Sequence, residues 1–231
     1  MSSTTCRRYD PGDYDRGIDF FRRLYRSSDA VPFWLPQRWE YAEYLVSPLN
    51  RNRGYSHDWE ETIYLWESSS GEVVGVLCSE NPDSDIFVHT MPDYRHLEKE
   101  MIEVAEERIV RRTLGLSDIR VWCASGDSFR ESLLRSRRYE KTGDIEYLNW
   151  RDLAGSVPDL SLPEGHSLHD MVSEYGLDLQ HKIDRMTGAF DSPTYPAEIY
   201  RNMQRGFSYR KSLDLYSTDS RGNITSFVSP G

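Results

Sequence analysis

Apolar residues recur at two different spacings along the chain, and the changes in spacing mark the elements that we expect. From Tyr14 to Tyr25 the apolar side chains lie three and four positions apart, which predicts an amphipathic helix. Pro36 favours the start of a second helix, which we expect to run through Leu45. From Ile63 to Leu77 the pattern flanks the turn residues Ser68-Ser69-Ser70-Gly71, which is typical of a β-hairpin.

The middle of the chain predicts a strand-helix-strand unit. Asp85 to Thr90 reads as a strand, and Met91-Pro92-Asp93 leads from it into a long helix. The apolar stripe of that helix is Leu97, Met101, Ala105 and Ile109. Further elements are expected in the order strand, helix, strand at Ile119 to Cys123, Ser128 to Ser136, and Asp144 to Trp150. With a first strand at Thr4 to Tyr9, this order predicts a mixed α+β fold whose mostly antiparallel sheet contains one parallel pair.

The last third of the chain repeats the start of the pattern. Residues 154–165 are rich in Gly and Pro and read as a linker between a domain at 1–153 and a second unit at 166–231. We expect a strand near His166 to Leu168, a helix from Val172 to Met186 and another helix near Pro196, followed by a hairpin. Placing Gly71 on Gly222 aligns Ile63 to Leu77 with Asp214 to Val228. The second unit is therefore predicted to be a partial copy that stops before its fourth strand.

Composition and charge narrow the partners. The formal net charge of −10 argues against broad contact with nucleic acid or an anionic membrane surface, and favours a small molecule or a protein. Three cysteines without CxxC spacing predict neither a disulfide framework nor a metal site. Neither a signal peptide nor a membrane span is apparent, so we expect a cytoplasmic protein. The last strand, at Asn223 to Val228, should leave a sheet edge exposed, which favours a homo-oligomer.

Two segments and the order of elements resemble a known family. Met91-Pro92-Asp93-Tyr94-Arg95 looks like the segment after the fourth strand of the GNAT superfamily of N-acetyltransferases, and Ser132 to Gly143 is similar to the family's late helix and turn. The resemblance covers residues 4–150, about two thirds of the chain. With a partial second copy behind it, the whole resembles the tandem GNAT proteins, which often pair a worn copy with a working one.

The resemblance implies acetyl-CoA as cofactor and places its binding residues. They are Val88 and Thr90 in the fourth strand and Arg95, His96 and Leu97 in the loop that follows. In the family this loop carries two small residues, because backbone N–H groups approach the pyrophosphate closely. Here Glu98 and Glu100 stand at those two positions. The alternative interpretation is a helix that begins with acidic residues and binds no ligand.

The catalytic groups that the resemblance implies are only partly present. The family often has an Asn on the late helix and a Tyr seven residues later that protonates the leaving thiolate, and these positions fall on Asp127 and Leu134. A shifted alignment would bring in Tyr139, which reads better as a core aromatic. Glu80 and His89, near the ends of two strands, are the candidate general bases.

Two hypotheses follow. The first is an acetyl-CoA-dependent N-acetyltransferase-like protein that acts on a small-molecule or peptide amine. This hypothesis includes the case in which the activity is weak or lost. The second is a non-catalytic module of the same fold that binds a partner or stabilises another domain, as Glu98, Glu100 and Leu134 suggest.

Overall fold

The computed structural model contains two sheets, each with helices beside it. It describes residues 3–27, 34–52, 54, 56–81, 83–147, 149, 152, 154–155, 161–172, 180–185 and 197–228. The five strands of the first sheet lie in the order of the sequence and are β1 (Thr4–Arg8), β2 (Tyr64–Ser68), β3 (Val73–Cys78), β4 (Asp85–Thr90) and β5 (Arg120–Val121). The three strands of the second sheet are β6 (Ser167–Asp170), β7 (Leu215–Thr218) and β8 (Ile224–Val228). Neighbouring strands are antiparallel except for β4 and β5, which are parallel as predicted.

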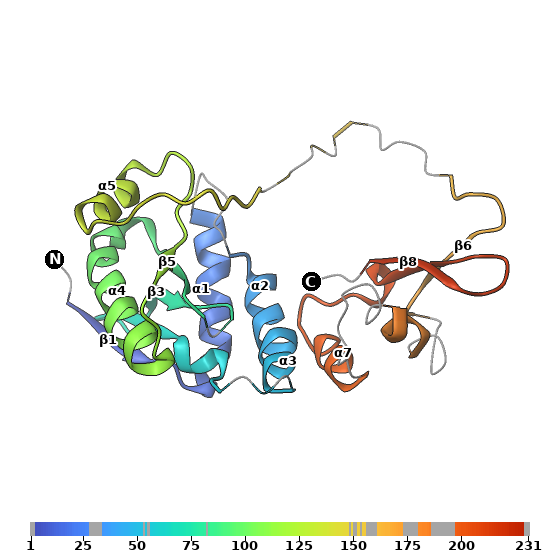
Figure 1. Cartoon of the computed structure of the whole chain (residues 1–231), viewed down its shortest axis with the longest axis horizontal. Helices are drawn as coiled ribbons and strands as arrows, with labels where there is room; N and C mark the ends of the chain where they lie inside the picture. Colours follow the sequence, from blue (N-terminus) through green and yellow to red (C-terminus); the bar gives the residue numbers. More distant parts are fainter. Residues whose placement is uncertain are drawn as a thin grey trace.

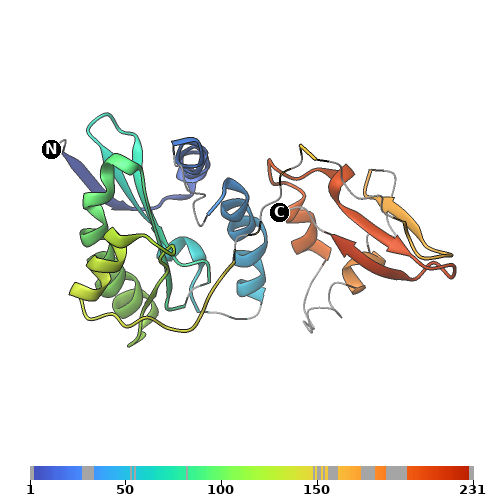
Figure 2. The same cartoon turned by 90° about the horizontal axis from the view of Figure 1, so that it is seen from above.

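Helices cover both faces of the first sheet (Figures 1 and 2). One face carries η1 (Pro11–Asp13), α1 (Tyr14–Ser27), α2 (Pro36–Tyr41), η2 (Ala42–Val46) and α3 (Ser47–Asn52), with η3 (Trp59–Thr62) leading into β2. The other carries η4 (Pro92–Leu97), α4 (Glu98–Val104), η5 (Ala105–Leu114) and α5 (Ser128–Ser136). The second sheet is accompanied by the helical residues 180–185, α7 (Ala197–Met203) and η6 (Lys211–Leu213). Because helices lie on both sides, all six residues of β3 are buried.

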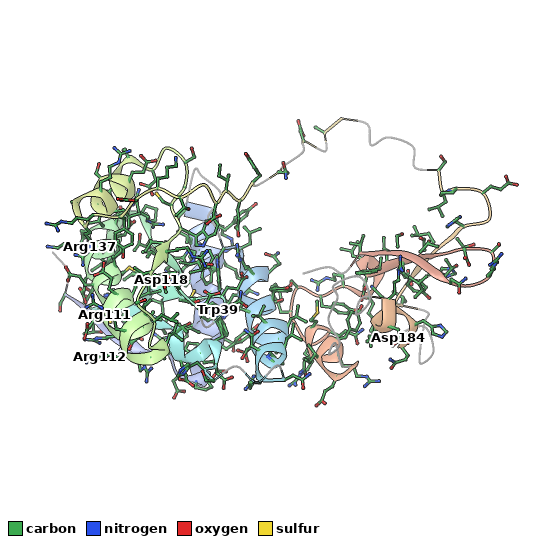
Figure 3. The ribbon with its side chains drawn as sticks, viewed as in Figure 1. Trp39, Arg111, Arg112, Asp118, Arg137 and Asp184 are labelled. Atoms are coloured by element: carbon green, nitrogen blue, oxygen red, sulfur yellow. The ribbon has the colours of Figure 1, made fainter. Side chains whose placement is uncertain are left out.

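The side chains of β4 alternate between two apolar cores. Phe87 packs with α1 and α2 in a core that also holds Phe21 and Trp39, whereas Ile86 and Val88 belong to the core beneath α4. Figure 3 shows Trp39 near α1, and Arg111, Arg112 and Arg137 on the far side of the first unit. Among the described residues, no helix has the length and apolar content that crossing a bilayer would require.

The hairpins of the two units share one pairing register. Tyr64 pairs with Leu77 and Trp66 with Gly75, and the residues aligned with them in sequence, Leu215 with Val228 and Ser217 with Ser226, pair in the same way. Both hairpins shift register at the same place, directly after Trp66 and after Ser217. Gly71 and Gly222 both turn with positive φ, 81° and 80°. The duplication and the unit boundaries at 153 and 166 remain predictions, which this shared register supports.

Three expectations need correction. Residues 144–147 form no strand, and Leu148 and Trp150 lie outside the described residues. Ile145 and Tyr147 lie two positions apart, as apolar residues on one face of a strand do, but their side chains are 64 % and 79 % exposed. The neighbouring strand β5 has only the two residues Arg120–Val121 of the expected Ile119 to Cys123, so it offers little backbone for a further strand to pair with.

The second correction concerns the helix expected to end at Leu45. It continues through α3 to Asn52, past Pro48. A wider π-type turn at η2 precedes the proline, and such a turn changes the hydrogen-bond pattern at the point where proline lacks its N–H donor.

The third correction concerns the start of the long helix. Residues Pro92–Leu97 form a tighter 3₁₀ segment before α4 begins at Glu98. In the second unit, residues 180–185 lie within the helix expected from Val172 to Met186, whereas 173–179 and Met186 lie outside the described residues.

The close packing of α1 on α2 leads to a first prediction. A Cβ on Gly17 would lie 2.5 Å from a ring carbon of Trp39, which is fully buried. Gly→Ala inside a helix normally stabilises by about 0.5–1 kcal/mol. At Gly17 we expect the opposite sign, a loss of about 1–3 kcal/mol from overpacking, in urea denaturation. Gly143→Ala, where nothing lies within 4 Å, is the matched control and should be close to neutral.

The outer edge of the second sheet leads to another prediction. In the part of the chain that the structure describes, no strand pairs with the outer side of β8, and Val228 there is 60 % exposed. We expect concentration-dependent self-association in light scattering, because an open edge offers unpaired N–H and C=O groups. Val228→Lys should weaken association. The control Tyr147→Lys, at an exposed position outside any strand, should not weaken it. A strict monomer at high concentration would contradict the prediction.

Candidate functional site

The edge of β4 that faces β5 is open beyond Ile86. The carbonyl of Ile86 accepts a hydrogen bond from the N–H of Trp122 at 3.1 Å, and the pairing between β4 and β5 ends at Ile86 and Val121. Because backbone direction alternates along a strand, Val88 and Thr90 point their N–H and C=O groups to the same side as Ile86. Consistent with this alternation, the N–H of Met91 donates to Val74 on the opposite side, at 2.9 Å. The described residues supply no strand to pair with Val88 and Thr90 there.

An ion-pair network closes the far end of this open edge. Glu98 is fully buried, and its two carboxylate oxygens accept from Arg95 Nε and from Arg130 Nε, each at 2.9 Å. Arg95 also donates to both oxygens of Asp127, at 2.8 and 2.6 Å. Thr90 Oγ1 donates to Glu98 at 3.3 Å, which ties the network to the end of β4. We call Arg95, Glu98, Asp127 and Arg130 the arginine-carboxylate network.

The pKa values of the carboxyl groups show which effect dominates. Burial raises the pKa of Glu98, but Arg130 and Arg95 outweigh it, so that the pKa lies below its usual value. The same balance of burial against Arg95 lowers the pKa of Asp127. Both groups are therefore carboxylates at neutral pH, and the network holds two positive and two negative charges. The charges of the two arginines are thus balanced within the network.

The other predicted cofactor residues divide between the core and the surface. Leu97 is buried in the core beneath α4, and His96 is exposed on η4. Glu100, the second expected glycine position, turns away from the network and accepts from Trp66 Nε1 of β2 at 3.2 Å. Of the two acidic residues expected to oppose a phosphate, the structure therefore brings only Glu98 to Arg95.

The candidate base Glu80 is held by an arginine. Arg38 of α2 donates to both oxygens of Glu80, from Nε and Nη2, each at 2.8 Å. Arg38 also lies 3.4 Å from Glu146 Oε2. A bidentate pair of this kind satisfies the carboxylate and fixes its orientation, so Glu80 acts as an anchor for α2.

The candidate base His89 lies inside an aromatic cluster. Its ring is 5.0 Å from Phe21, 5.7 Å from Trp34 and 6.4 Å from Phe87, measured between ring centroids. Nε2 is buried and has no hydrogen-bond partner among the described residues. Burial, with smaller contributions from Arg130 and Arg38, holds the pKa of His89 well below its usual value, so the imidazole is neutral at physiological pH.

The position of the expected general acid is part of the core. Leu134 is buried beneath α4, as its side chain requires. Tyr139 packs at the edge of the same core and donates to Glu106 at 2.9 Å. Burial and that carboxylate raise its pKa, so it holds its proton.

Sequence reasoning missed the role of Arg130. Asp127 caps α5 by accepting from the N–H of Arg130 at 3.1 Å, and the Arg130 side chain, in the first turn of the same helix, donates to Glu98. The only signal was Asp127 before a helical run. Nothing in the sequence showed that Arg130, in the first turn of that helix, would be buried against Glu98.

Two further kinds of site, a metal site and a reactive thiol, find little support in the described residues. No three His, Cys, Asp or Glu side chains gather there as a metal site would need. Burial raises the pKa of Cys6 to about 11, which disfavours a thiolate nucleophile.

The neutral state of His89 predicts a pH effect on stability. The unfolded chain binds a proton at His89 below about pH 6.5, whereas the folded chain does not, so stability should fall as the pH drops below that value. We expect His89→Phe to remove up to about 1.4 kcal/mol of this loss per pH unit in urea denaturation between pH 6.5 and 5. His96→Phe, at an exposed position, is the control. Equal slopes for the wild type and His89→Phe would show that His89 is protonated in the folded protein.

Comparison with known proteins bears on the fold. No family model matches the sequence, and no curated protein is significantly similar to it. Among solved structures, a GCN5-related N-acetyltransferase from Sphaerobacter thermophilus superposes with a TM-score of 0.53 at 14% identity, over 97% of this chain and 70% of that one. A predicted acetyltransferase from Clostridium acetobutylicum, solved with acetyl-CoA, gives a TM-score of 0.41 at 10% identity, over 64% of this chain and 96% of that one. The chain has the fold of the GCN5-related N-acetyltransferases.

Proposed function

We propose that this protein is an acetyl-CoA-dependent N-acetyltransferase-like protein that transfers an acetyl group to a small-molecule or peptide amine. The observation that carries the proposal is the open edge of β4, where Val88 and Thr90 direct backbone N–H and C=O groups away from β3. The amide groups of a CoA arm are suited to pair with such an edge, as an added strand would. The shared fold with the S. thermophilus acetyltransferase supports this assignment.

The residues present fit the cofactor in part. Val88 and Thr90 would hold its amide arm, and Arg95 and Arg130, which share Glu98 with Thr90, would be the cations for its phosphates. Glu98 opposes this second contact, because its carboxylate occupies both arginines. A like charge about 4 Å from a phosphate costs about 4 kcal/mol at an effective dielectric of 20. Bound acetyl-CoA would supply the activated acetyl group.

The chain's own contribution to proton transfer rests on His89. Its neutral imidazole has Nε2 free of hydrogen bonds among the described residues, whereas Glu80 already accepts two hydrogen bonds from Arg38. His89 is therefore the better candidate to take the proton from an acceptor amine. Its low pKa makes it a weak base, so we expect slow turnover.

The arginine-carboxylate network favours a second candidate, a non-catalytic module of the same fold. A network with all its charges paired stabilises the packing of α5 on η4 and α4 without any ligand. Leu134 adds to this interpretation, because it cannot protonate a leaving thiolate.

Calorimetric titration of the full chain with acetyl-CoA tests the proposal. We expect measurable binding by the wild type and at least about tenfold tighter binding by Glu98→Gln, because the substitution removes the opposing charge and releases Arg130 from its carboxylate partner, while Arg95 keeps Asp127. Glu98→Gln should also lose about 3–5 kcal/mol of stability, since it breaks a buried ion pair. Glu100→Gln is the matched control, because Glu100 lies outside the network. No binding at millimolar acetyl-CoA by wild type and Glu98→Gln alike would exclude the enzyme and leave the non-catalytic module.

A further inference from the structure

An exposed phenylalanine lies beside the arginine-carboxylate network. Phe129 is in the first turn of α5, between Asp127 and Arg130 of the network, and it is 48 % exposed. On the helices that cover this side of the first sheet, it is the one large apolar side chain that is exposed among the described residues. Isolated apolar side chains are common on protein surfaces, so the exposure by itself indicates no ligand.

The contact between Phe129 and Arg95 is a second, independent observation. The guanidinium carbon of Arg95 lies over the Phe129 ring, 4.8 Å from its centroid. Arg95 also donates to Glu98 and to Asp127, so the guanidinium is held in place over the ring. The ring is thus covered from one side by a fixed cation, whereas nearly half of the side chain stays open to solvent. A second planar group can stack on it there.

The position of Phe129 relative to the open edge of β4 indicates what that planar group is. Thr90, at the end of the edge, and Arg95 share Glu98, so Phe129 lies at the end where the phosphates of CoA would meet the arginines. In CoA the phosphates join the amide arm to an adenine base. A cofactor whose arm runs along Val88 and Thr90 would therefore carry its base past Arg95, where Phe129 offers an aromatic face.

Building on the proposed function, we propose that Phe129 binds the adenine base of acetyl-CoA by stacking. This contact makes the protein select the complete cofactor over its shorter acyl-carrying arm. Stacking needs no free charge, so it remains available while Glu98 and Asp127 occupy Arg95. Removing the ring beneath a stacked base typically weakens binding by roughly ten- to a hundredfold.

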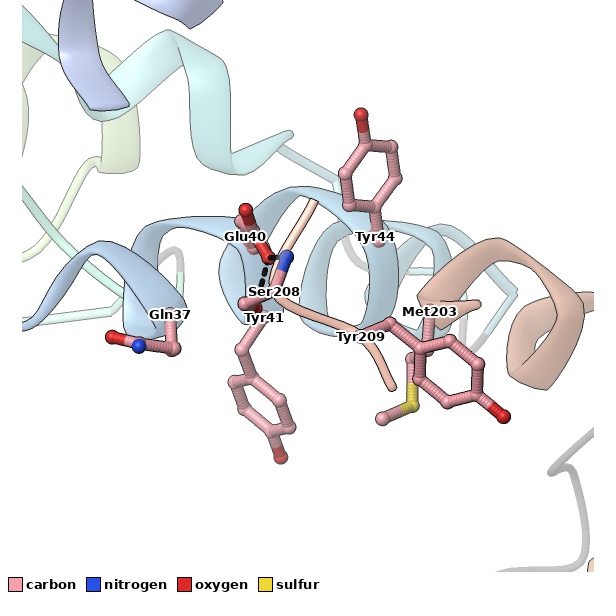
Figure 4. A pocket seen from close by; sticks show the side chains of 7 residues that line it. All are labelled: Gln37, Glu40, Tyr41, Tyr44, Met203, Ser208 and Tyr209. Carbon is pink, nitrogen blue, oxygen red and sulfur yellow. Dashed lines mark hydrogen bonds between the residues drawn. The ribbon is translucent and has the colours of Figure 1, made fainter. Parts of the chain in front are cut away.

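Phe207 provides a matched control for Phe129. It is 55 % exposed, and the guanidinium carbon of Arg22 lies 4.1 Å from its ring centroid. It belongs to the loop after α7, where its neighbour Ser208 donates to Glu40 of α2 (Figure 4). Phe207 therefore matches Phe129 in exposure and in its covering cation, but Arg22 is not a member of the arginine-carboxylate network.

Calorimetric titration of the full chain with acetyl-CoA and with S-acetyl-4′-phosphopantetheine tests the inference. The second ligand has the acyl-carrying arm and one phosphate but no adenine. We expect Phe129→Ala to bind acetyl-CoA at least about tenfold more weakly than the wild type and to bind the shorter ligand equally well. Phe207→Ala should bind both ligands as the wild type does.

Two further variants separate stacking from apolar bulk. Phe129→Trp keeps an aromatic face and should bind acetyl-CoA at least as tightly as the wild type. Phe129→Leu is apolar but has no ring, so it should weaken binding nearly as much as Phe129→Ala. This pair decides the question where the shorter ligand binds too weakly to be measured.

The outcomes distinguish the inference from the proposed function. Wild-type affinity of Phe129→Ala or Phe129→Leu for acetyl-CoA, equal weakening for both ligands, or equal weakening by Phe207→Ala would overturn the role of Phe129 and leave the proposed function intact. If only Glu98→Gln binds acetyl-CoA measurably, the same Phe129 substitutions are compared in that background. If neither the wild type nor Glu98→Gln binds at millimolar concentration, the proposed function fails and the inference fails with it.

Discussion

The buried carboxylate of Glu98 is the interaction on which the arrangement of the first unit depends. It receives Arg95 from η4, Thr90 from the end of β4 and Arg130 from α5, so one side chain joins two neighbouring segments to a helix 32 residues further along the chain. Removing a charge from water is costly, and it is tolerated here because each oxygen has a cationic donor with good geometry. The same contacts that hold α5 in place also occupy the two arginines that share Glu98 with the end of β4. Stability and ligand affinity therefore compete for the same two arginines.

The opposite face of β4 follows a different principle. Phe21, Trp34 and Phe87 surround His89 through ring contacts, and Trp39 fills the space that Gly17 leaves open. Aromatic packing of this kind excludes water and keeps the imidazole uncharged. One strand thus carries aromatic packing around His89 on one face and the arginine-carboxylate network at its other side, and Arg38 covers the rings of Trp34 and Phe87 at the edge of the aromatic cluster.

Much of the fold could be predicted, because it is encoded in local patterns. The period of α1, the turn at Gly71 and the strand at Asp85–Thr90 each depend on residues close together in the chain. The short β5 and the missing strand at 144–147 depend on how much edge a neighbour offers, which the local pattern does not carry. At the site, the sequence put Arg95 and Glu98 in one short segment but did not predict their ion pair. It could not show that Arg130 would approach from another helix, or that Arg38 would hold Glu80, because both contacts join segments more than thirty residues apart.

Asp214 introduces an asymmetry between two otherwise matching hairpins. It is fully buried and accepts from Lys182, Tyr200 and Tyr209, whereas the residue aligned with it in the first unit, Ile63, belongs to an apolar core. Two hairpins with the same register within one chain could exchange partners during folding. If the second hairpin paired into the first unit, Asp214 would enter a core of aromatic and aliphatic groups without its lysine, at a cost of several kcal/mol. A buried charge that adds little to the stability of its own unit can thus prevent one half of the chain from being mistaken for the other.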